Sequence, residues 1–258
     1  TVTTQSCATC GVTVSGTLRI GKSGDAAGAT TTLNAADKTW TLAGTTGTPL
    51  IILSSPAGAF TPSTSTVIYS GINATGTTSV VGTPYYNLQT TGAETYDLAA
   101  DTTVSNILTI GASATLDAKT VTLTLSGTTG APFVKTGTFT PSSSTVSYTG
   151  NYATDNTTVT AATYNHLILN NGSETYALAG ATSANGTVTA TAGTLEVGTQ
   201  TLTAGNVTVS GGTLSMTGTG GIVKISGGGT FSMSSGSFVT SDVATAVQLT
   251  SADTVTPT

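Results

Sequence analysis

Charged residues are scarce in this chain. They make up 7% of it, with six Lys and Arg residues against eleven Asp and Glu, and the formal net charge is −5. A protein that binds nucleic acid needs a basic surface to neutralise phosphates. We therefore expect no nucleic-acid partner.

Metal ligands are equally few. The cysteines are Cys7 and Cys10, in Cys-Ala-Thr-Cys, and the single histidine, His166, is far from them in sequence. A structural zinc site needs about four ligands, so we expect no metal and no cofactor. In a cytosolic βαβ protein this cysteine spacing would suggest redox chemistry. No helix is expected after it here, and we predict a disulfide, within the chain or between chains, that fixes the N-terminal segment.

Long apolar runs and helical periodicity are also missing. No stretch of 18 apolar residues occurs, which argues against membrane insertion. The 32 glycines interrupt nearly every apolar run before a helix could form. The chain starts at Thr1 without a charged and apolar leader, and this suggests a secreted, extracellular or cell-surface protein whose signal peptide has been removed, although an engineered fragment would look the same.

What remains is dominated by Thr, Ser, Gly, Ala and Val. A Ser- and Thr-rich chain could be a disordered stalk, but disordered chains usually have few β-branched residues and high net charge. Thr and Val suit a pleated surface because branching at Cβ restricts χ1. The composition therefore predicts ordered all-β structure.

One stretch occurs twice. The segment 60–71, which begins Phe60-Thr61-Pro62, returns with conservative changes as 139–150, which begins Phe139-Thr140-Pro141, at a spacing of 79 (139 minus 60). The similarity continues on both sides of these segments. A spacing kept over this length is typical of repeat architectures.

A finer period follows near the C-terminus. Thr194-Leu195, Thr213-Leu214 and Thr230-Phe231 recur at intervals of 19 (213 minus 194) and 17 (230 minus 213). Units of this length cannot bury an apolar face alone and must stack on their neighbours, so we predict a parallel β-helix (β-solenoid) with rungs of roughly 16 to 20 residues. The alternative is a tandem of antiparallel β-sandwiches, which fits the long period but not the short one.

The expected organisation has three parts. Residues 1–29 form an N-terminal strand segment with the cysteine pair, and residues 239–258 form a strand-like tail. Between them lies a solenoid over 30–238. Its parts are repeats at about 60–138 and 139–211 and Gly-rich rungs at 212–238.

The repeat also carries a resemblance. The run Thr138-Phe139-Thr140-Pro141 to Thr149-Gly150, with Tyr164-Asn165-His166-Leu167 and Gly193-Thr194-Leu195-Glu196 after it, resembles the β-helical repeats of large secreted and cell-surface proteins of bacteria and archaea. It covers roughly residues 30 to 235. The resemblance implies stalks, adhesins or extracellular filaments, and it brings no catalytic signature.

Candidate catalytic residues are sparse. The best acidic cluster is Glu94, Asp97 and Asp101, but Glu94 recurs as Glu174 in the second repeat, which favours a structural, turn-capping role. His166 is expected to fill an added position between Asn165 and Leu167, as a surface or turn residue. We expect that the protein is not an enzyme.

Tyrosines and asparagines offer the remaining candidate sites. Three tyrosine pairs recur between the repeats, and we expect inward packing or rung-to-rung stacking rather than a sugar-binding ladder. The pairs are Tyr69/Tyr148, Tyr86/Tyr164 and Tyr96/Tyr176. Asn73, Asn156 and Asn171 start Asn-X-Ser/Thr triplets in predicted loops and are candidate glycosylation sites.

The ends suggest a function. Both are strand-like without an evident cap, and unpaired strand edges invite another chain. We therefore predict a structural subunit of an extracellular, self-assembling filament, joined head to tail by β-strand addition. The candidate assembly residues are Val12, Val14, Val239, Val243, Val247 and Leu249. The alternative is a monomeric or trimeric surface stalk or adhesin that binds glycans or surfaces.

Overall fold

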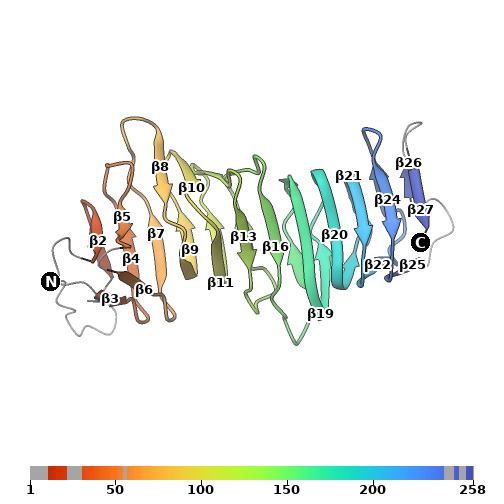
Figure 1. Ribbon diagram of the computed structural model, residues 1–258, viewed down its shortest axis with the longest axis horizontal. Helices are drawn as coiled ribbons and strands as arrows, with labels where there is room; N and C mark the ends of the chain where they lie inside the picture. The colour runs from red at the N-terminus through yellow and green to blue at the C-terminus, as the bar shows by residue number, and fades with distance from the viewer. Residues whose placement is uncertain (1–10, 22–30, 55–56, 241–246, 250–253, 258) are drawn as a thin grey trace.

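The protein is a rod of β-strands (Figure 1). The structure, a computed structural model, describes residues 11–21, 31–54, 57–240, 247–249 and 254–257. Every strand pairing in these ranges is parallel, and the only antiparallel contact among them is an isolated bridge between Ser54 and Ala57. The predicted parallel β-solenoid is therefore confirmed, and the antiparallel sandwich alternative is wrong.

The described residues contain no helix that is long and apolar enough to cross a membrane.

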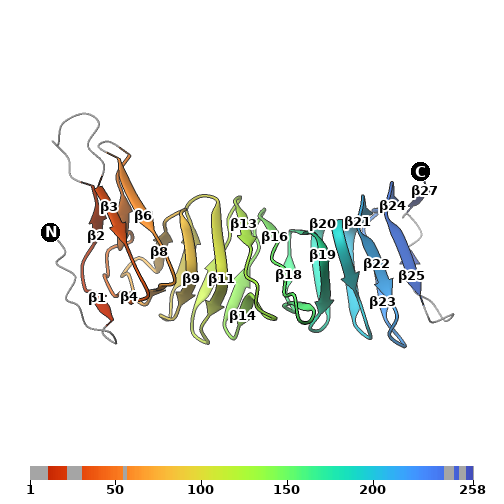
Figure 2. The ribbon, with the colours of Figure 1, turned by 90° about the horizontal axis from the view of Figure 1, so that it is seen from below.

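The coil has three faces. After each set of three strand positions the chain returns to the face on which it started, one rung further along the rod. Figure 2 shows the rungs following one another along the rod. For example, Val207 in β21 (Thr201–Val209) pairs with Phe231 in β24 (Thr230–Met233), and the chain forms β22 (Thr213–Met216) and β23 (Ile222–Ile225) between them. Five longer strands bend around corners and so belong to more than one face: β9, β11, β19, β20 and β21.

Face 1 holds two consecutive ladders, which meet where the Thr158 amide donates to the Gly130 carbonyl at 2.8 Å. Its strands are β1 (Val12–Val14), β4 (Thr39–Leu42), β7 (Thr66–Tyr69), β9 (Pro84–Thr90), β11 (Thr102–Ile110), β14 (Phe133–Lys135), β17 (Thr157–Val159), β19 (His166–Leu178), β20 (Thr182–Glu196), β22 and β25 (Ser237–Thr240).

Face 2 follows face 1 along the chain. Its strands are β2 (Leu18–Ile20), β5 (Leu50–Ile52), β8 (Thr77–Val80), β10 (Thr95–Leu98), β12 (Thr115–Asp117), β15 (Thr138–Thr140), β18 (Thr163–Tyr164), β20, β21, β23 and β26 (Val247–Leu249). Face 3 completes each turn. Its strands are β3 (Thr31–Asn34), β6 (Gly58–Thr61), β9, β11, β13 (Thr122–Leu125), β16 (Thr145–Tyr148), β19, β20, β21, β24 and β27 (Thr254–Pro257).

Most rungs are longer than the sequence predicted. One ladder on face 3 can be followed position by position through eight successive rung steps, with spacings from 19 (104 minus 85) to 24 (233 minus 209). Its members are Tyr85, Val104, Leu125, Tyr148, Leu169, Ala190, Val209, Met233 and Pro257. The widest spacing between paired positions is 32 (50 minus 18), from Leu18 to Leu50 on face 2. The rung length expected from the sequence is therefore too short for most rungs, and that prediction is wrong.

The interval between Thr213 and Thr230 is not a rung step. Thr194 does pair with Thr213, as the interval of 19 (213 minus 194) predicted. Thr213, however, pairs with Ser237, whereas Thr230 lies on another face, so the similar residues at 213 and 230 are not stacked on each other. A Thr followed by a large apolar residue occurs on every face, because all faces share the same alternation.

That alternation explains why this composition folds. In β13 the side chains of Leu123 and Leu125 are buried, while Thr122 and Thr124 face outward. Each buried leucine contributes roughly 1.5–3 kcal/mol relative to exposure, and β-branched Thr suits the outer, half-covered side of the strand.

The strands flanking the expected solenoid region are in register with it. β1 and β2, before residue 30, pair with β4 and β5, and β26 and β27, after residue 238, pair with β23 and β24.

The long repeat does not return to the same face. From Tyr69 in β7, three rung steps along face 1 lead through Thr90 and Ile110 to Lys135. The chain then forms β15 on face 2 before it reaches β16, where Tyr148 occupies the position equivalent to Tyr69. From one copy of the repeat to the next, the chain thus makes three full turns of the coil and then advances by two more faces.

Tyrosines of both repeats lie in the core. Six have side chains with essentially no exposure: Tyr69, Tyr85, Tyr96, Tyr148, Tyr164 and Tyr176. The Tyr69 and Tyr85 hydroxyls are 2.9 Å apart, and those of Tyr148 and Tyr164 are 3.2 Å apart. Inward packing is confirmed, but Tyr164 corresponds to Tyr85, and the predicted pairing with Tyr86 is wrong.

Burial of these phenols predicts a loss of stability in alkali. Burial raises the pKa of Tyr69 and of Tyr96 to about 12 from an ordinary value of 10.0. The folded state therefore holds these protons more tightly than the unfolded chain does. Their contribution to stability is complete below about pH 10 and is lost as the pH rises through about 12. Chemical unfolding followed by circular dichroism over this range should show a falling free energy of unfolding. Ionisation of all phenols near pH 10 with no loss of stability would contradict the prediction.

Candidate functional site

The end of the rod that carries β25 exposes its core. Tyr176, Leu195 and Leu214 form a column of paired, inward-facing residues on face 1 with at most 1% exposure. The next member, Phe238 in β25, pairs with Leu214, yet it is 36% exposed. Its position is a core position, and it is exposed because no described strand covers it from beyond the last rung.

The outer edge of this rung has no partner strand in the described residues. Among the strands of these ranges, β25 pairs only with β22, β26 only with β23, and β27 only with β24. Four large apolar side chains are exposed among the described residues, and two of them, Phe238 and Val239, lie in β25. Exposed apolar edge strands attract further strands.

The opposite end has a similar strand. In β1, Val12 pairs with Trp40 and Val14 pairs with Leu42, so both valines face the core. Each is only half-buried, although Trp40 and Leu42 are buried. No described strand pairs with the outer edge of β1.

The other predicted assembly residues do not share one kind of position. Val239 faces outward and is 45% exposed. Val247 in β26 pairs with Val223 and packs against the core, and Leu249 pairs with Ile225. Val243 lies outside the described residues. The strands proposed for donation to a neighbour are therefore paired with their own chain, and it is their outer edges that lack a described partner strand.

The acidic cluster expected from the sequence is not a single site. Glu94 accepts hydrogen bonds from the Asn73 amide at 2.6 Å and the Thr78 hydroxyl at 2.8 Å. Glu174 does the same in the second repeat, with the amides of Tyr152 and Thr157. Both carboxylates are buried and fix a long loop. The equivalent positions of the two glutamates and their hydrogen-bond partners confirm the predicted turn-capping role.

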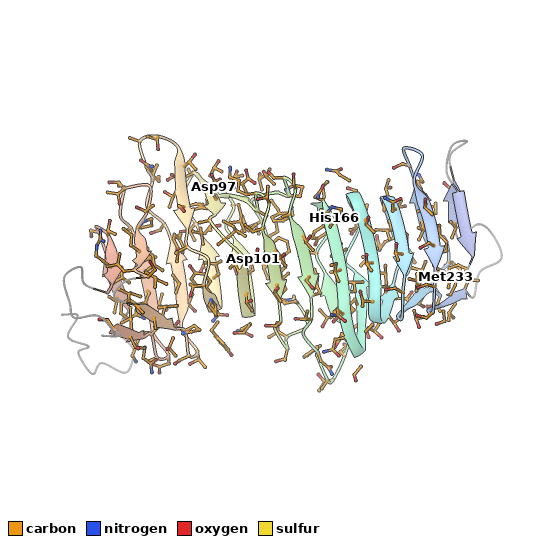
Figure 3. The ribbon with its side chains drawn as sticks, viewed as in Figure 1. Asp97, Asp101, His166 and Met233 are labelled. Atoms are coloured by element: carbon orange, nitrogen blue, oxygen red, sulfur yellow. The ribbon has the colours of Figure 1, made fainter. Side chains whose placement is uncertain are left out.

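The two aspartates of that cluster have separate partners, and Figure 3 shows them apart on the coil. Asp101 accepts from the Thr122 amide at 2.8 Å. Asp97 forms an ion pair with Lys119, which also pairs with Asp117.

Lys119 joins two rungs of face 2 electrostatically. Hydrogen bonds to Asp97 and Asp117 raise the pKa of its amine. Burial disfavours the charged form of Asp117, but hydrogen bonds from Ser142 and Lys119 outweigh it, and the pKa of the carboxyl is lowered. No cluster of three or more His, Cys, Asp or Glu side chains suited to a metal occurs in the described ranges.

His166 lies in a strand, at a position equivalent to Asn87. Thr66 pairs with Asn87 and Thr145 pairs with His166 at the same spacing of 79 (166 minus 87), so the expected insertion at His166 is wrong. Its Nδ1 accepts from the Thr187 amide at 3.1 Å, much as the Asn87 side chain accepts from the Ile107 amide at 3.3 Å. This hydrogen bond connects two rungs, and Figure 3 shows His166 in the middle part of the rod.

The candidate glycosylation sites differ in accessibility. Asn156 is exposed in the loop before β17. Asn73 lies in the loop before β8, and its side-chain amide donates to Thr75 and to the Thr77 carbonyl. Asn171 lies within β19 rather than in a loop, and its side-chain amide donates to the Thr149 carbonyl at 3.0 Å. Cys7 and Cys10 lie outside the described residues.

Comparisons of the chain with protein families, with curated proteins and with solved structures each found no match.

Proposed function

We propose that this chain is a structural subunit of an extracellular filament whose copies add to each other end to end through their open strand edges. The observation that carries the proposal is the exposure of Phe238, which occupies a core column but has no covering rung within the described residues. Burying it under a further rung would remove apolar surface from water at roughly 25 cal/mol per Å².

The geometry of the rod supports assembly in one direction. All ladders are parallel, so one end presents one edge of each ladder and the other end presents the opposite edge. Contacts between the two different ends of identical molecules propagate as a fibre when the copies follow one another along one axis, because such contacts do not close into a ring. The resemblance to secreted and cell-surface repeat proteins supports a location outside the cell.

A charge at the open end should prevent growth. In Phe238→Lys, addition of a second copy would bury an ammonium group in an apolar core, which is costly. We expect the concentration needed for assembly to rise at least tenfold, about 1.4 kcal/mol per joint. Sedimentation velocity and electron microscopy of the purified chain over a range of concentrations measure the concentration at which assembly begins.

The matched control is Val134→Lys. Val134 is 39% exposed, close to the value for Phe238, but it lies in β14, in the middle of the rod. This variant should assemble like the unmodified chain. Equal loss of assembly in both variants, or a monomeric unmodified chain at every concentration, would overturn the proposal.

A further inference from the structure

Among the described strands, the outermost rung at each end of the rod has one strand on each face. The first contains β1, β2 and β3, one strand on each face, and the last contains β25, β26 and β27, again one on each face. Since β27 lies on face 3, the next strand of a continued coil would lie on face 1, where β1 lies. A second copy can thus continue the order of the faces.

The facing strands on face 1 also agree in side-chain direction. In β25, Phe238 and Thr240 face the core, because they pair with the buried residues Leu214 and Met216. In β1, Val12 and Val14 face the core. If the two strands pair in parallel with Phe238 beside Val12, core side chains meet core side chains, whereas a slip of one residue would set core positions against outward ones.

Charge does not oppose this pairing. β1 is Val-Thr-Val and β25 is Ser-Phe-Val-Thr, so neither strand carries a charge that would have to leave water. Face 2 is a weaker candidate, because Leu18 and Ile20 in β2 are already buried and gain little from a covering strand.

We infer that β25 of one copy pairs in parallel register with β1 of the next copy, with Phe238 beside Val12 and Val239 beside Thr13. This inference rests on the proposed function and specifies its joint. A second copy of this chain fits the outer edge of β25 because its own β1 lies on the same face and alternates core-facing and outward side chains in the same order.

Paired cysteines test the register. Neighbouring parallel strands lie about 4.8 Å apart, within the range of about 4.4–6.8 Å that a disulfide needs between Cα atoms. In a Cys7→Ser, Cys10→Ser background, a Val239→Cys chain and a Thr13→Cys chain are mixed, allowed to assemble and oxidised. We expect a covalent dimer on a non-reducing gel that contains one copy of each. Replacing the Thr13→Cys chain by an Arg19→Cys chain, whose cysteine lies on face 2, should reduce the dimer yield at least tenfold.

The outcomes separate the joint from the proposed function. Filaments in the micrographs together with no cross-link, or an equal yield with Arg19→Cys, would overturn the β25–β1 register and leave end-to-end assembly standing. Absence of any assembly in the unmodified chain would overturn both. A selective cross-link that is lost on adding Phe238→Lys to the Val239→Cys chain would support both.

Discussion

A Gly150→Ala chain is expected to lose about 1–3 kcal/mol of its free energy of unfolding, which is typical of an overpacked site. A Cβ at Gly150 would overlap the Gly127 carbonyl oxygen of the rung before it, and a Cβ at Gly127 would overlap the Asn106 carbonyl oxygen in the same way. The obstacle is backbone rather than a side chain that can rotate. Relief therefore requires the corner to open and disturbs the ladder beside it. Chemical unfolding followed by far-ultraviolet circular dichroism measures the loss.

The control for this substitution lies at the same corner, one rung further on. A Cβ at Gly172 would meet no atom within 4 Å. Gly172→Ala should therefore change stability by less than about 0.5 kcal/mol, as is usual for substitutions away from strained or packed sites. If both alanine variants are equally stable, the close approach of the backbones at this corner is refuted.

Tyr85→Ala should destabilise the fold by about 3–5 kcal/mol, the usual cost of removing a buried aromatic side chain, whereas Tyr86→Ala should cost less than about 1 kcal/mol. Tyr85 is fully buried, packs against Phe60 with ring centroids 6.1 Å apart, and donates its hydroxyl to the Val81 carbonyl at 2.9 Å. Tyr86 is the next residue and faces the other way at the corner of β9, where it is only partly buried. The thermal midpoints and free energies of unfolding of the two variants give the comparison.

The second repeat provides an independent check. Tyr164→Ala should be as damaging as Tyr85→Ala, and Asn165→Ala as mild as Tyr86→Ala, because these residues occupy the equivalent positions. A larger effect at Tyr86 than at Tyr85 would mean that the strand is shifted by one residue, since such a shift exchanges the two sides of a strand.

The sequence was sufficient for the fold class because a short repeated unit with alternating residues has few ways to bury its apolar side. The pair Thr194 and Thr213 showed one true rung step. It was not sufficient for the rung length, because corner loops vary freely in length. The loop from β16 to β17 spans residues 149–156, for instance, whereas β21 passes from face 2 to face 3 with no loop at all.

The candidate site was predictable only in part. Strand-like ends with Val12, Val14 and Val239 were visible in the sequence, and the structure places all three in the terminal rungs. The pairing of the C-terminal strands with their own chain was not visible, because the same main-chain hydrogen bonds form with a neighbouring chain. Phe238 was missed. Two apolar residues in succession, Phe238 and Val239, did not show which of them faces the core. The pairing of Phe238 with the buried Leu214 identifies it as a core residue, and its place in the last described rung explains its exposure.

The rotation of the repeat also determines how the rod presents itself to its surroundings. The long loop after β7 leaves from face 1 and its equivalent after β16 leaves from face 3, and Figure 1 shows them projecting from opposite edges. Each further repeat of this length would turn its loop by the same two-thirds of a circle, so that three consecutive repeats would point it in three directions before the first direction recurs. A fibre built in this way has no single decorated side, and a binding partner could approach it from any direction.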